Sequence, residues 1–490
     1  MYISEMKLEN FKSFSGTCKI EFNQCMNFFV GNNNCGKTTI FKAIEFILQG
    51  GSKDDFITKN IEEAEANVSV EIELKGKDLE NLITTDEDLK KYKGYLIDND
   101  GEKSLRIMRS SKNDKIQQDG KGKSKEIELD IKKVRIFNPE KQQFENPTGV
   151  DKTISALFDA QFVWADLKNE EYQDFGKTKI VGKIINTITQ EFQQTEIWQT
   201  FKDAHKKAFG ENENSLSAKL EPIQEKLQTL LSEQYGDTKV KFNFGLPEID
   251  NFFKTGNILL SDNGIETDTS EKGTGMQRAL TLSLIQVYAD VVNKLNKQKD
   301  EISKPVFFFI DEPETFLHPK AQDKLLEALE KISKSSQIFI TTHSPYLLKK
   351  FKKEHHQIKI FSKENSNTKI DTGEFLNLFG DISPTWGEIN YYAFGILSIE
   401  FHNELYGFVQ EKAVSENPDN RYLIHFDEYL VSKNIAKSKK GLKETKQTPV
   451  DQTLPTYIRN FIHHPENTHN KKYTDEELKN SIDILIALLK

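Results

Sequence analysis

The chain is poor in cysteine and has no long hydrophobic run. Its 490 residues include 3 cysteines, Cys18, Cys25 and Cys35, and no CxxC pair. So few thiols favour a reducing compartment over a disulfide-stabilised scaffold. No apolar stretch approaches the roughly 20 residues of a membrane-spanning helix. The first residues also lack the basic and apolar segments of a secretion signal, so we expect a cytoplasmic protein without membrane attachment.

An excess of positive charge is also absent. Lys and Arg number 67 against 76 Asp and Glu, which gives a net charge of −9 at pH 7. The chain as a whole is therefore not a basic nucleic-acid-binding protein, and any such contact must use a local patch. Two segments are rich in basic residues, 103–134 and 433–446. Each is a candidate nucleic-acid surface, although such charge runs are more often solvated loops.

Residues 31–39 match the P-loop pattern GxxxxGK[ST]. The apolar run 26–30 before them predicts a strand, and the run 39–48 after them predicts a helix. A strand, a glycine loop and a helix N-terminus form a nest of backbone N–H groups that can hold nucleotide phosphates. Lys37 would reach the β- and γ-phosphates, and the Thr38 hydroxyl would bind Mg²⁺. The predicted ATP-binding residues are Gly31, Asn32, Asn33, Asn34, Cys35, Gly36, Lys37, Thr38 and Thr39.

A second motif completes a hydrolytic site. Residues 305–310 are a continuous apolar run, typical of a central strand in a covered parallel sheet, and Asp311 and Glu312 follow directly. An aspartate in this position holds magnesium, and the adjacent glutamate serves as the general base for the attacking water. The stretch between Lys37 and Asp311 exceeds a small NTPase domain, so the sheet must be split around an inserted lobe.

Two further segments suggest a composite site. Residues 272–278 open a predicted long helix over 275–297 and resemble the ABC signature motif, which contacts the γ-phosphate bound by a second subunit. Its candidate residues are Gly273, Thr274, Gly275 and Gln277. His343 follows the next buried strand and resembles the switch histidine that senses the γ-phosphate. The glutamine of the Q-loop has two candidates, Gln143 and Gln161.

These motifs, with LENFKSF at 8–14, DEPETFLHP at 311–319 and THSP at 342–345, resemble the bacterial ABC/SMC-type ATPases. That group includes overcoming-lysogenization-defect (OLD) proteins, RecF-like repair proteins and ATPase subunits of anti-phage systems. The resemblance covers about residues 1–380. It implies an α/β fold with a split P-loop head, an inserted helical lobe and an all-helical C-terminal domain. It also implies that two heads enclose two nucleotides, in a homodimer or a larger homo-oligomer.

This reading divides the chain into four parts. They are a first half of the head with a β-hairpin arm at 1–150, a helical lobe at 151–235, a second half of the head at 236–383, and a C-terminal domain at 384–490. The last part lacks the acidic strand ends of the Toprim domain that OLD-like nucleases carry. It reads instead as helices over 387–412, 421–435, 453–463 and 474–490.

Arg459, Asn460 and His464 resemble the R-x4-H motif of HEPN ribonucleases. An arginine and a histidine at this spacing on a helix can clamp a phosphate and move a proton, which suits metal-free RNA cleavage through the 2′-OH. The alternative is a helix in which the same residues stabilise packing or bind a partner.

The tail segments 400–406 and 458–467 are also similar to those of Septu-type (PtuA-like) defence ATPases, which act with a separate HNH nuclease. The leading hypothesis is therefore a Mg²⁺-dependent ATPase that acts as the sensor and regulator of a partner nuclease in anti-phage defence. The second is a HEPN-type ribonuclease gated by the heads. The third is a DNA-repair ATPase with 103–134 as its DNA contact.

Overall fold

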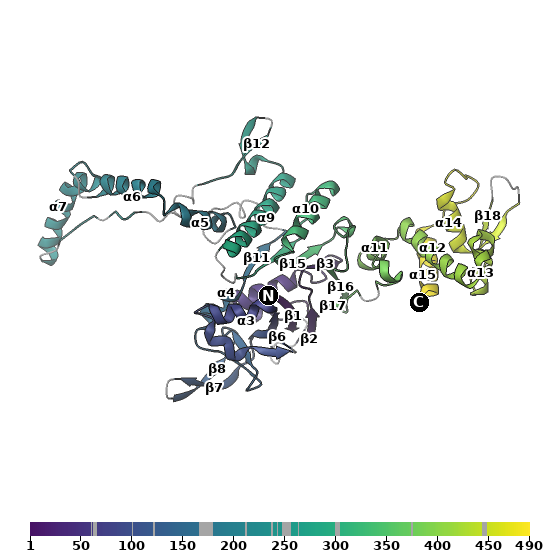
Figure 1. Cartoon of the computed structure of the whole chain (residues 1–490), viewed down its shortest axis with the longest axis horizontal. Coiled ribbons are helices and arrows are strands. Elements are labelled where there is room, and N and C mark those ends of the chain that lie inside the picture. The colour runs from purple at the N-terminus through teal and green to yellow at the C-terminus, as the bar shows by residue number, and fades with distance from the viewer. Residues whose placement is uncertain are drawn as a thin grey trace. The chain divides into compact units, whose positions relative to one another are not determined.

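The computed structural model describes residues 1–59, 61, 66–99, 101–120, 123–165, 180–210, 213–236, 239–242, 244–246, 256–262, 264–298, 304–373, 376–442 and 448–490. The chain divides into two compact units, one formed by residues 1–165 with 302–490 and the other by 166–301 (Figure 1). The division into four parts drawn from the sequence stays a prediction. No described helix is both long and apolar enough to cross a membrane.

The first unit contains a six-stranded, mostly parallel sheet that was expected from the buried apolar runs. Its strands lie in the order β11 (Asp159–Val163), β14 (Val306–Asp311), β15 (Gln337–Thr342), β3 (Met26–Gly31), β16 (His356–Glu364) and β17 (Asn367–Asp371). Only β17 runs antiparallel to its neighbour. Every residue of β14, β15 and β3 is buried, as in a sheet covered on both faces. Their carboxyl ends therefore meet at one edge, where ligands bind in such sheets.

Strand β11 contradicts the prediction of helix throughout 151–235. The other described elements of that range are helices, namely α4 (Val150–Leu157), α5 (Ile180–Phe192), α6 (Glu196–Phe209) and α7 (Leu216–Tyr235). Residues 159–163 instead pair in parallel with the apolar strand β14. Pairing with a buried neighbour favours a strand here, because β-propensity depends mainly on packing against adjacent strands.

A second, antiparallel sheet lies beside the first. Its strands are β10 (Gln143–Glu145), β9 (Arg135–Asn138), β6 (Glu102–Ser110), β4 (Ser69–Lys75), β1 (Tyr2–Glu9) and β2 (Thr17–Glu21), with β5 (Ile97–Asn99) on β6. In β4, buried and half-buried residues alternate, as its sequence predicts. The lysine- and glycine-rich sequence of 110–125 predicts a flexible hairpin tip, and this stretch contributes to a regular hairpin of β7 (Asp114–Gly120) and β8 (Lys123–Leu129).

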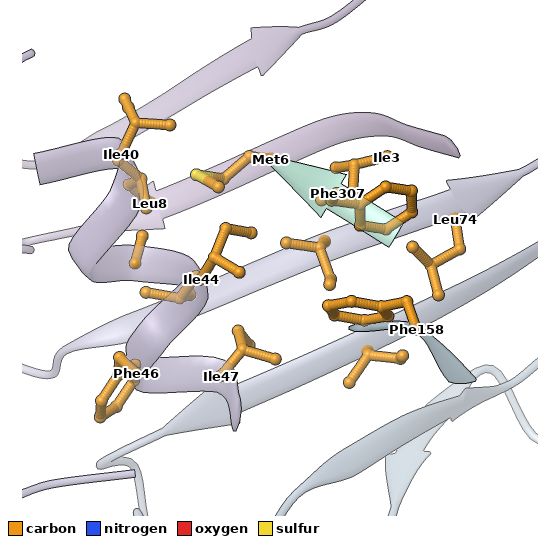
Figure 2. Close-up of a cluster of buried hydrophobic side chains, with 14 of the residues drawn as sticks. Ile3, Met6, Leu8, Ile40, Ile44, Phe46, Ile47, Leu74, Phe158 and Phe307 are labelled. Atoms are coloured by element: carbon orange, nitrogen blue, oxygen red, sulfur yellow. The ribbon is translucent and has the colours of Figure 1, made fainter. Parts of the chain in front are cut away.

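Helix α1 (Thr39–Gln49) joins the two sheets. Its residues Ile40, Ile44 and Ile47 belong to one buried cluster with Met6 of β1 and Phe307 of β14 (Figure 2). Burying each isoleucine contributes roughly 2 kcal/mol. The N-terminus of α1, which follows the P-loop, is thereby fixed against both sheets. The remaining short elements of the head are α2 (Lys53–Phe56), α3 (Lys77–Thr85), η1 (Lys90–Tyr95), α10 (Pro319–Ile332) and η4 (Pro345–Leu348).

The second unit is built mainly of helices. In addition to α5, α6 and α7, it contains the hairpin β12 (Leu259–Asp262) and β13 (Ile265–Asp268), the turn η3 (Thr269–Glu271) and helix α9 (Thr274–Gln298). Helix α9 confirms the long helix predicted over 275–297, and it packs against α5. The sequence of 238–266 predicts strands. Among the described residues of this range the structure forms them from Leu259 onward, and residues 247–255 lie outside the described part.

The C-terminal helices form a separate core. They are α11 (Trp386–Phe394), α12 (Ile399–Glu416), α13 (Leu423–Ser432), α14 (Leu454–His463) and α15 (Asp475–Leu489), with short turns η5 (Gly380–Ile382) and η6 (Pro418–Arg421). The predicted helix 387–412 is two helices, because Gly395 adopts a left-handed conformation at φ 66° and ends α11. A small hairpin, β18 (Lys439–Gly441) and β19 (Val450–Gln452), makes the domain mostly rather than entirely helical.

Candidate nucleotide-binding and hydrolysis site

The P-loop leaves β3 and enters α1 through two glycines with positive φ, Gly31 at 136° and Gly36 at 95°. A Cβ on Gly31 would lie 2.1 Å from the Phe361 carbonyl oxygen of β16, so the close pairing of β3 requires glycine. The first turn of α1 contains no acidic residue. The dipole of α1 therefore favours an anion at this helix end.

The ammonium of Lys37 lies inside this loop. Its Nζ donates hydrogen bonds to the carbonyl oxygens of Gly31 at 3.1 Å and Asn32 at 3.0 Å. It also lies 2.8 Å from Nε2 of His343. Only 5% of Lys37 is exposed, and burial lowers the pKa of its amine. Because an ammonium group can only donate, this contact requires a neutral His343 that accepts at Nε2.

Asp311 ends β14 within reach of the P-loop. Its Oδ1 accepts from the Thr38 hydroxyl at 3.1 Å and from the Thr341 hydroxyl. Burial raises the pKa of Asp311, which means that its ionised form has too little compensating charge. A divalent cation would supply that charge, and the hydroxyl and carboxylate oxygens are the hard ligands that Mg²⁺ prefers. The donor set at Thr38 and Asp311 thus fits magnesium.

Glu312 adopts the left-handed region at φ 43° and directs its carboxylate to the histidine. Its Oε1 lies 3.4 Å from Nε2 of His343. The hydrogen bond from His343 is the main cause that lowers the pKa of Glu312, and the charge of Lys37 adds to it. The carboxylate is therefore ionised at neutral pH, as a general base must be. A strained backbone at such a position is typical of a functional site.

Nε2 of His343 has two neighbours that require opposite protonation states. It accepts from Lys37 only when it carries no proton, and it donates to Glu312 only when it does. Nε2 can therefore hydrogen-bond to only one of these two neighbours at a time.

A second glutamate, Glu314, belongs to this site, although no separate role was predicted for it. Its Oε1 accepts from the backbone N–H of His343 at 2.7 Å. The motif Asp-Glu-Pro-Glu at 311–314 contains it, and the spacing alone could have raised it as a candidate. Its partners lie on another strand, so only the fold shows them.

The other P-loop residues have supporting positions. Asn32, Asn33 and Asn34 are exposed on the loop. Cys35 is 2% exposed, and its Sγ lies 3.8 Å from Lys37 Nζ. The Thr39 hydroxyl lies 3.3 Å from the Ser13 hydroxyl rather than beside Asp311.

The signature residues lie in the second unit, at the start of α9. Gly273 precedes the helix, Thr274 and Gly275 open it, and its first turn carries no acidic residue. Nε2 of Gln277 donates to the Lys272 carbonyl at 2.8 Å and thereby stabilises the turn before the helix. Backbone N–H groups at this helix end suit a phosphate, as the sequence predicts.

Each Q-loop candidate hydrogen-bonds to a residue of its own strand. Gln143 lies in β10 of the other sheet and bonds to Glu145. Gln161 lies in β11, next to β14, but its amide donates to Asp159 at 2.6 Å. Because β11 runs parallel to β14, its end lies at the same edge of the sheet as Asp311.

The tail motif is only partly assembled. Helix α14 ends at His463, so His464 lies beyond the helix instead of sharing a face with Arg459. Pro465 explains this, because a residue before proline is disfavoured in the helical region. Asn460 and His464 line a pocket of about 310 Å³ that Arg459 does not line. Nη1 of Arg459 instead lies 3.3 Å from the Asn460 side-chain oxygen.

Several basic residues of the two candidate nucleic-acid segments already have structural partners. In 103–134, Arg109 is buried and donates to the Ile47 carbonyl, and Arg106 pairs with Glu71. In 433–446, Lys437 and Lys439 pair with Glu428 and Glu477, and residues 443–446 lie outside the described part. These contacts leave fewer free cations for nucleic acid than the sequence suggests.

The split parallel sheet, the P-loop and the carboxylates at the strand ends define a P-loop ATPase fold. The chain belongs to the AAA ATPase domain family, which matches residues 1–348. It is 28% identical to the Old nuclease of Escherichia phage P2 over 359 residues, which cover 71% of this chain and 57% of the nuclease. It is 25% identical to the endonuclease GajA of Bacillus cereus (strain HuB5-5) over 449 residues, covering 78% of this chain and 63% of the endonuclease.

The chain thus spans about three fifths of the length of these curated relatives. Among solved structures, it is similar to an Smc head bound to the C-terminal winged-helix domain of ScpA, with 17% identity, a TM-score of 0.43 and coverage of 76% of this chain and 97% of that one. It is similar to the SMC head domain from Thermotoga maritima with 15% identity, a TM-score of 0.35 and coverage of 76% and 99%. Likenesses this distant do not bear on function.

Proposed function

We propose that this chain is a Mg²⁺-dependent ATPase that serves as the sensor and regulatory subunit of a prokaryotic anti-phage defence system. ATP-bound heads associate in a homodimer or larger homo-oligomer and control a partner nuclease of the HNH type in the cytoplasm. One observation carries the ATPase part. At three neighbouring strand ends, Lys37 lies 2.8 Å from His343, His343 lies 3.4 Å from Glu312, and Asp311 accepts from Thr38, which follows Lys37 in the P-loop.

Each residue of the site has a separate role in the proposed hydrolysis of ATP. Lys37 and the α1 N-terminus bind the β- and γ-phosphates, while Thr38 and Asp311 hold Mg²⁺, which neutralises phosphate charge when bound. Glu312 takes a proton from the attacking water, and His343 contacts the γ-phosphate from the neighbouring strand. The residues from Gly273 to Gln277 of a second copy complete the phosphate site.

The regulatory role rests on two facts outside the site. Both curated relatives are named as nucleases. Its tail resembles those of Septu-type defence ATPases. A nuclease activity supplied by a separate chain reconciles these facts.

The ATPase and association steps can be tested with purified protein. Wild type should hydrolyse ATP with Mg²⁺, whereas Glu312→Gln should bind ATP, fail to hydrolyse it and accumulate as a dimer in light scattering. A Glu312→Gln protein that stays monomeric with saturating ATP contradicts head association. Phage challenge of cells that express the chain with its neighbouring nuclease gene tests the defence role, and Lys37→Ala should abolish protection.

A second function is favoured by the pocket at Asn460 and His464, which offers a polar site in the tail. In this proposal the chain itself cleaves RNA under the control of its heads. Purified chain should then cleave RNA or tRNA without a partner, and Arg459→Ala or His464→Ala should abolish cleavage. His463→Ala is the matched control, because His463 neighbours the motif but is not part of it. Cleavage that survives both motif substitutions refutes this function.

A further inference from the structure

We infer that Glu314 is a positioning residue for ATP hydrolysis, whose carboxylate holds the backbone beside His343 and so places the imidazole between Lys37 and Glu312. The inference rests on the proposed function, because it assigns Glu314 to the same hydrolytic site. No catalytic contact is ascribed to Glu314 itself.

One oxygen of Glu314 binds the whole turn that carries the histidine. Its Oε1 accepts from the Thr342 hydroxyl at 2.8 Å, from the His343 N–H at 2.7 Å and from the Ser344 N–H at 3.1 Å. These donors are consecutive residues at the end of β15, whereas Glu314 follows β14. The carboxylate therefore connects the loops after two adjacent strands, and those loops carry Glu312 and His343.

The surroundings of the Glu314 carboxylate are consistent with a role in holding the turn that carries His343. Burial raises the pKa of Glu314, so the site bears a desolvation cost. Its other oxygen, Oε2, is buried and has no hydrogen-bond partner among the described residues. Apart from the local backbone, the donors that compensate the carboxylate thus come from the histidine turn.

The turn is also held from helix α10. The Ser344 hydroxyl donates to Oε1 of Gln322 at 2.6 Å, and Nε2 of Gln322 donates to the Leu317 carbonyl at 3.0 Å. Gln322 thus connects the turn that carries His343 to the segment that follows Glu312. The ring of His343, 2.8 Å from Lys37 and 3.4 Å from Glu312, depends on the placement of that turn. A displacement of about 1 Å can lower a catalysed rate by about 100-fold.

The first test is a double-mutant cycle in ATP hydrolysis. Glu314→Ala should lower kcat by about 10- to 100-fold and leave the KM for ATP within about threefold, because the P-loop contacts remain. Glu314→Gln should recover most of the rate, since its amide oxygen can accept the same donors. Glu314→Ala combined with His343→Ala should be no slower than His343→Ala alone.

Glu404→Ala is the matched control. Glu404 is a half-buried carboxylate of α12 with a raised pKa and one hydroxyl donor, Thr385 at 2.7 Å. Its loss should leave kcat unchanged. If the effects of Glu314→Ala and His343→Ala multiply, or if Glu314→Ala hydrolyses ATP at the wild-type rate, the positioning role is wrong.

A second measurement does not depend on hydrolysis. In nucleotide-free protein, Glu314→Ala should raise hydrogen exchange in peptides that cover 341–345 by at least about tenfold, while peptides of β14 stay unchanged. Unchanged exchange at 341–345 overturns the inference even if wild type proves inactive. Wild type that does not hydrolyse ATP but shows the exchange difference refutes only the proposed ATPase.

Discussion

At the scale of single residues, hydrogen bonds hold the P-loop side chains in place before nucleotide binds. Lys37 Nζ is held by two loop carbonyls and by His343. The residues of this loop could be predicted because they are contiguous in sequence and their pattern fixes their geometry. The role of Glu314 could not be predicted, since its partners Thr342, His343 and Ser344 become neighbours only through the pairing of β14 with β15.

Removing the P-loop ammonium should weaken nucleotide binding. Lys37→Ala is expected to weaken ATP binding by about 10- to 100-fold, because a charge-assisted contact of about 1.5–3 kcal/mol is lost. Isothermal titration calorimetry measures this directly. Lys324→Ala is the control, since Lys324 is an exposed lysine of α10 paired with Glu327. Equal affinities for Lys37→Ala and wild type would exclude the loop as the nucleotide site.

The strands and helices differ in how well the sequence alone predicts them. The wholly apolar strands β14 and β15 were predictable, because burial on both faces leaves a continuous hydrophobic run. Strand β11 was not, since five residues between helices become a strand only by pairing with β14. Likewise, the R-x4-H spacing suggested one helix face, but α14 ends before His464. Local sequence patterns thus predict whether most segments form a helix or a strand. The exceptions depend on contacts with other segments or on the residue where an element ends.

The pairing of β3 with β16 should not tolerate a side chain at position 31. Gly31→Ala places a Cβ 2.1 Å from the Phe361 carbonyl oxygen and is expected to destabilise the fold by about 3 kcal/mol or more. Gly101→Ala is the matched control, because Gly101 also has a positive φ of 88° but no atom near its Cβ position. It should cost only about 1 kcal/mol. Urea unfolding measures both, and similar losses would show that the close strand approach is unimportant.

The packing of α12 against α15 should be sensitive to acid. His402 is fully buried between them, with Nε2 2.9 Å from the Ser481 hydroxyl, and burial lowers its pKa to about 4. The unfolded chain binds a proton near pH 6.5 while the folded chain does not. Stability is therefore full above pH 6.5 and falls as the pH drops toward 4.

Because of His402, the free energy of unfolding of the wild type should fall by about 2 kcal/mol between pH 7 and pH 5. His402→Gln should abolish this part of the fall. Urea unfolding at the two pH values, followed by hydrogen exchange in α12 and α15, measures the difference. His469→Gln should leave the pH dependence unchanged, because His469 is exposed. An unaltered slope for His402→Gln would mean that this histidine is protonated in the folded state.

At the scale of the whole molecule, the two halves of the expected phosphate site belong to different compact units. Lys37 lies in the first unit, and the signature turn at Gly273–Gly275 lies in the second. The sequence gives both motifs but no information on which copy completes which site, because that depends on assembly. Symmetric head pairing predicts that each site uses the P-loop of one copy and the signature turn of the other.

Mixing two inactive variants tests this arrangement. Lys37→Ala and Gly275→Asp should each abolish hydrolysis alone. Their mixture should recover about a quarter of the wild-type rate, because half of the dimers are mixed and each mixed dimer has one intact site. A mixture of Lys37→Ala with Lys37→Met provides the control and should stay inactive. No recovery in a mixture shown to contain mixed dimers would place both motifs of each site in a single copy.

The separate core of the tail has an evolutionary consequence. The buried cluster around α1 and the buried cluster of α12–α15 share no residue in the described part of the chain. Exchange of one tail for another by recombination would therefore not disturb the packing beneath the P-loop. A lineage of such ATPases can keep one nucleotide-responsive head and acquire new output domains. Conservation across such a lineage should consequently be high along β3, β14 and β15 and low beyond Phe379.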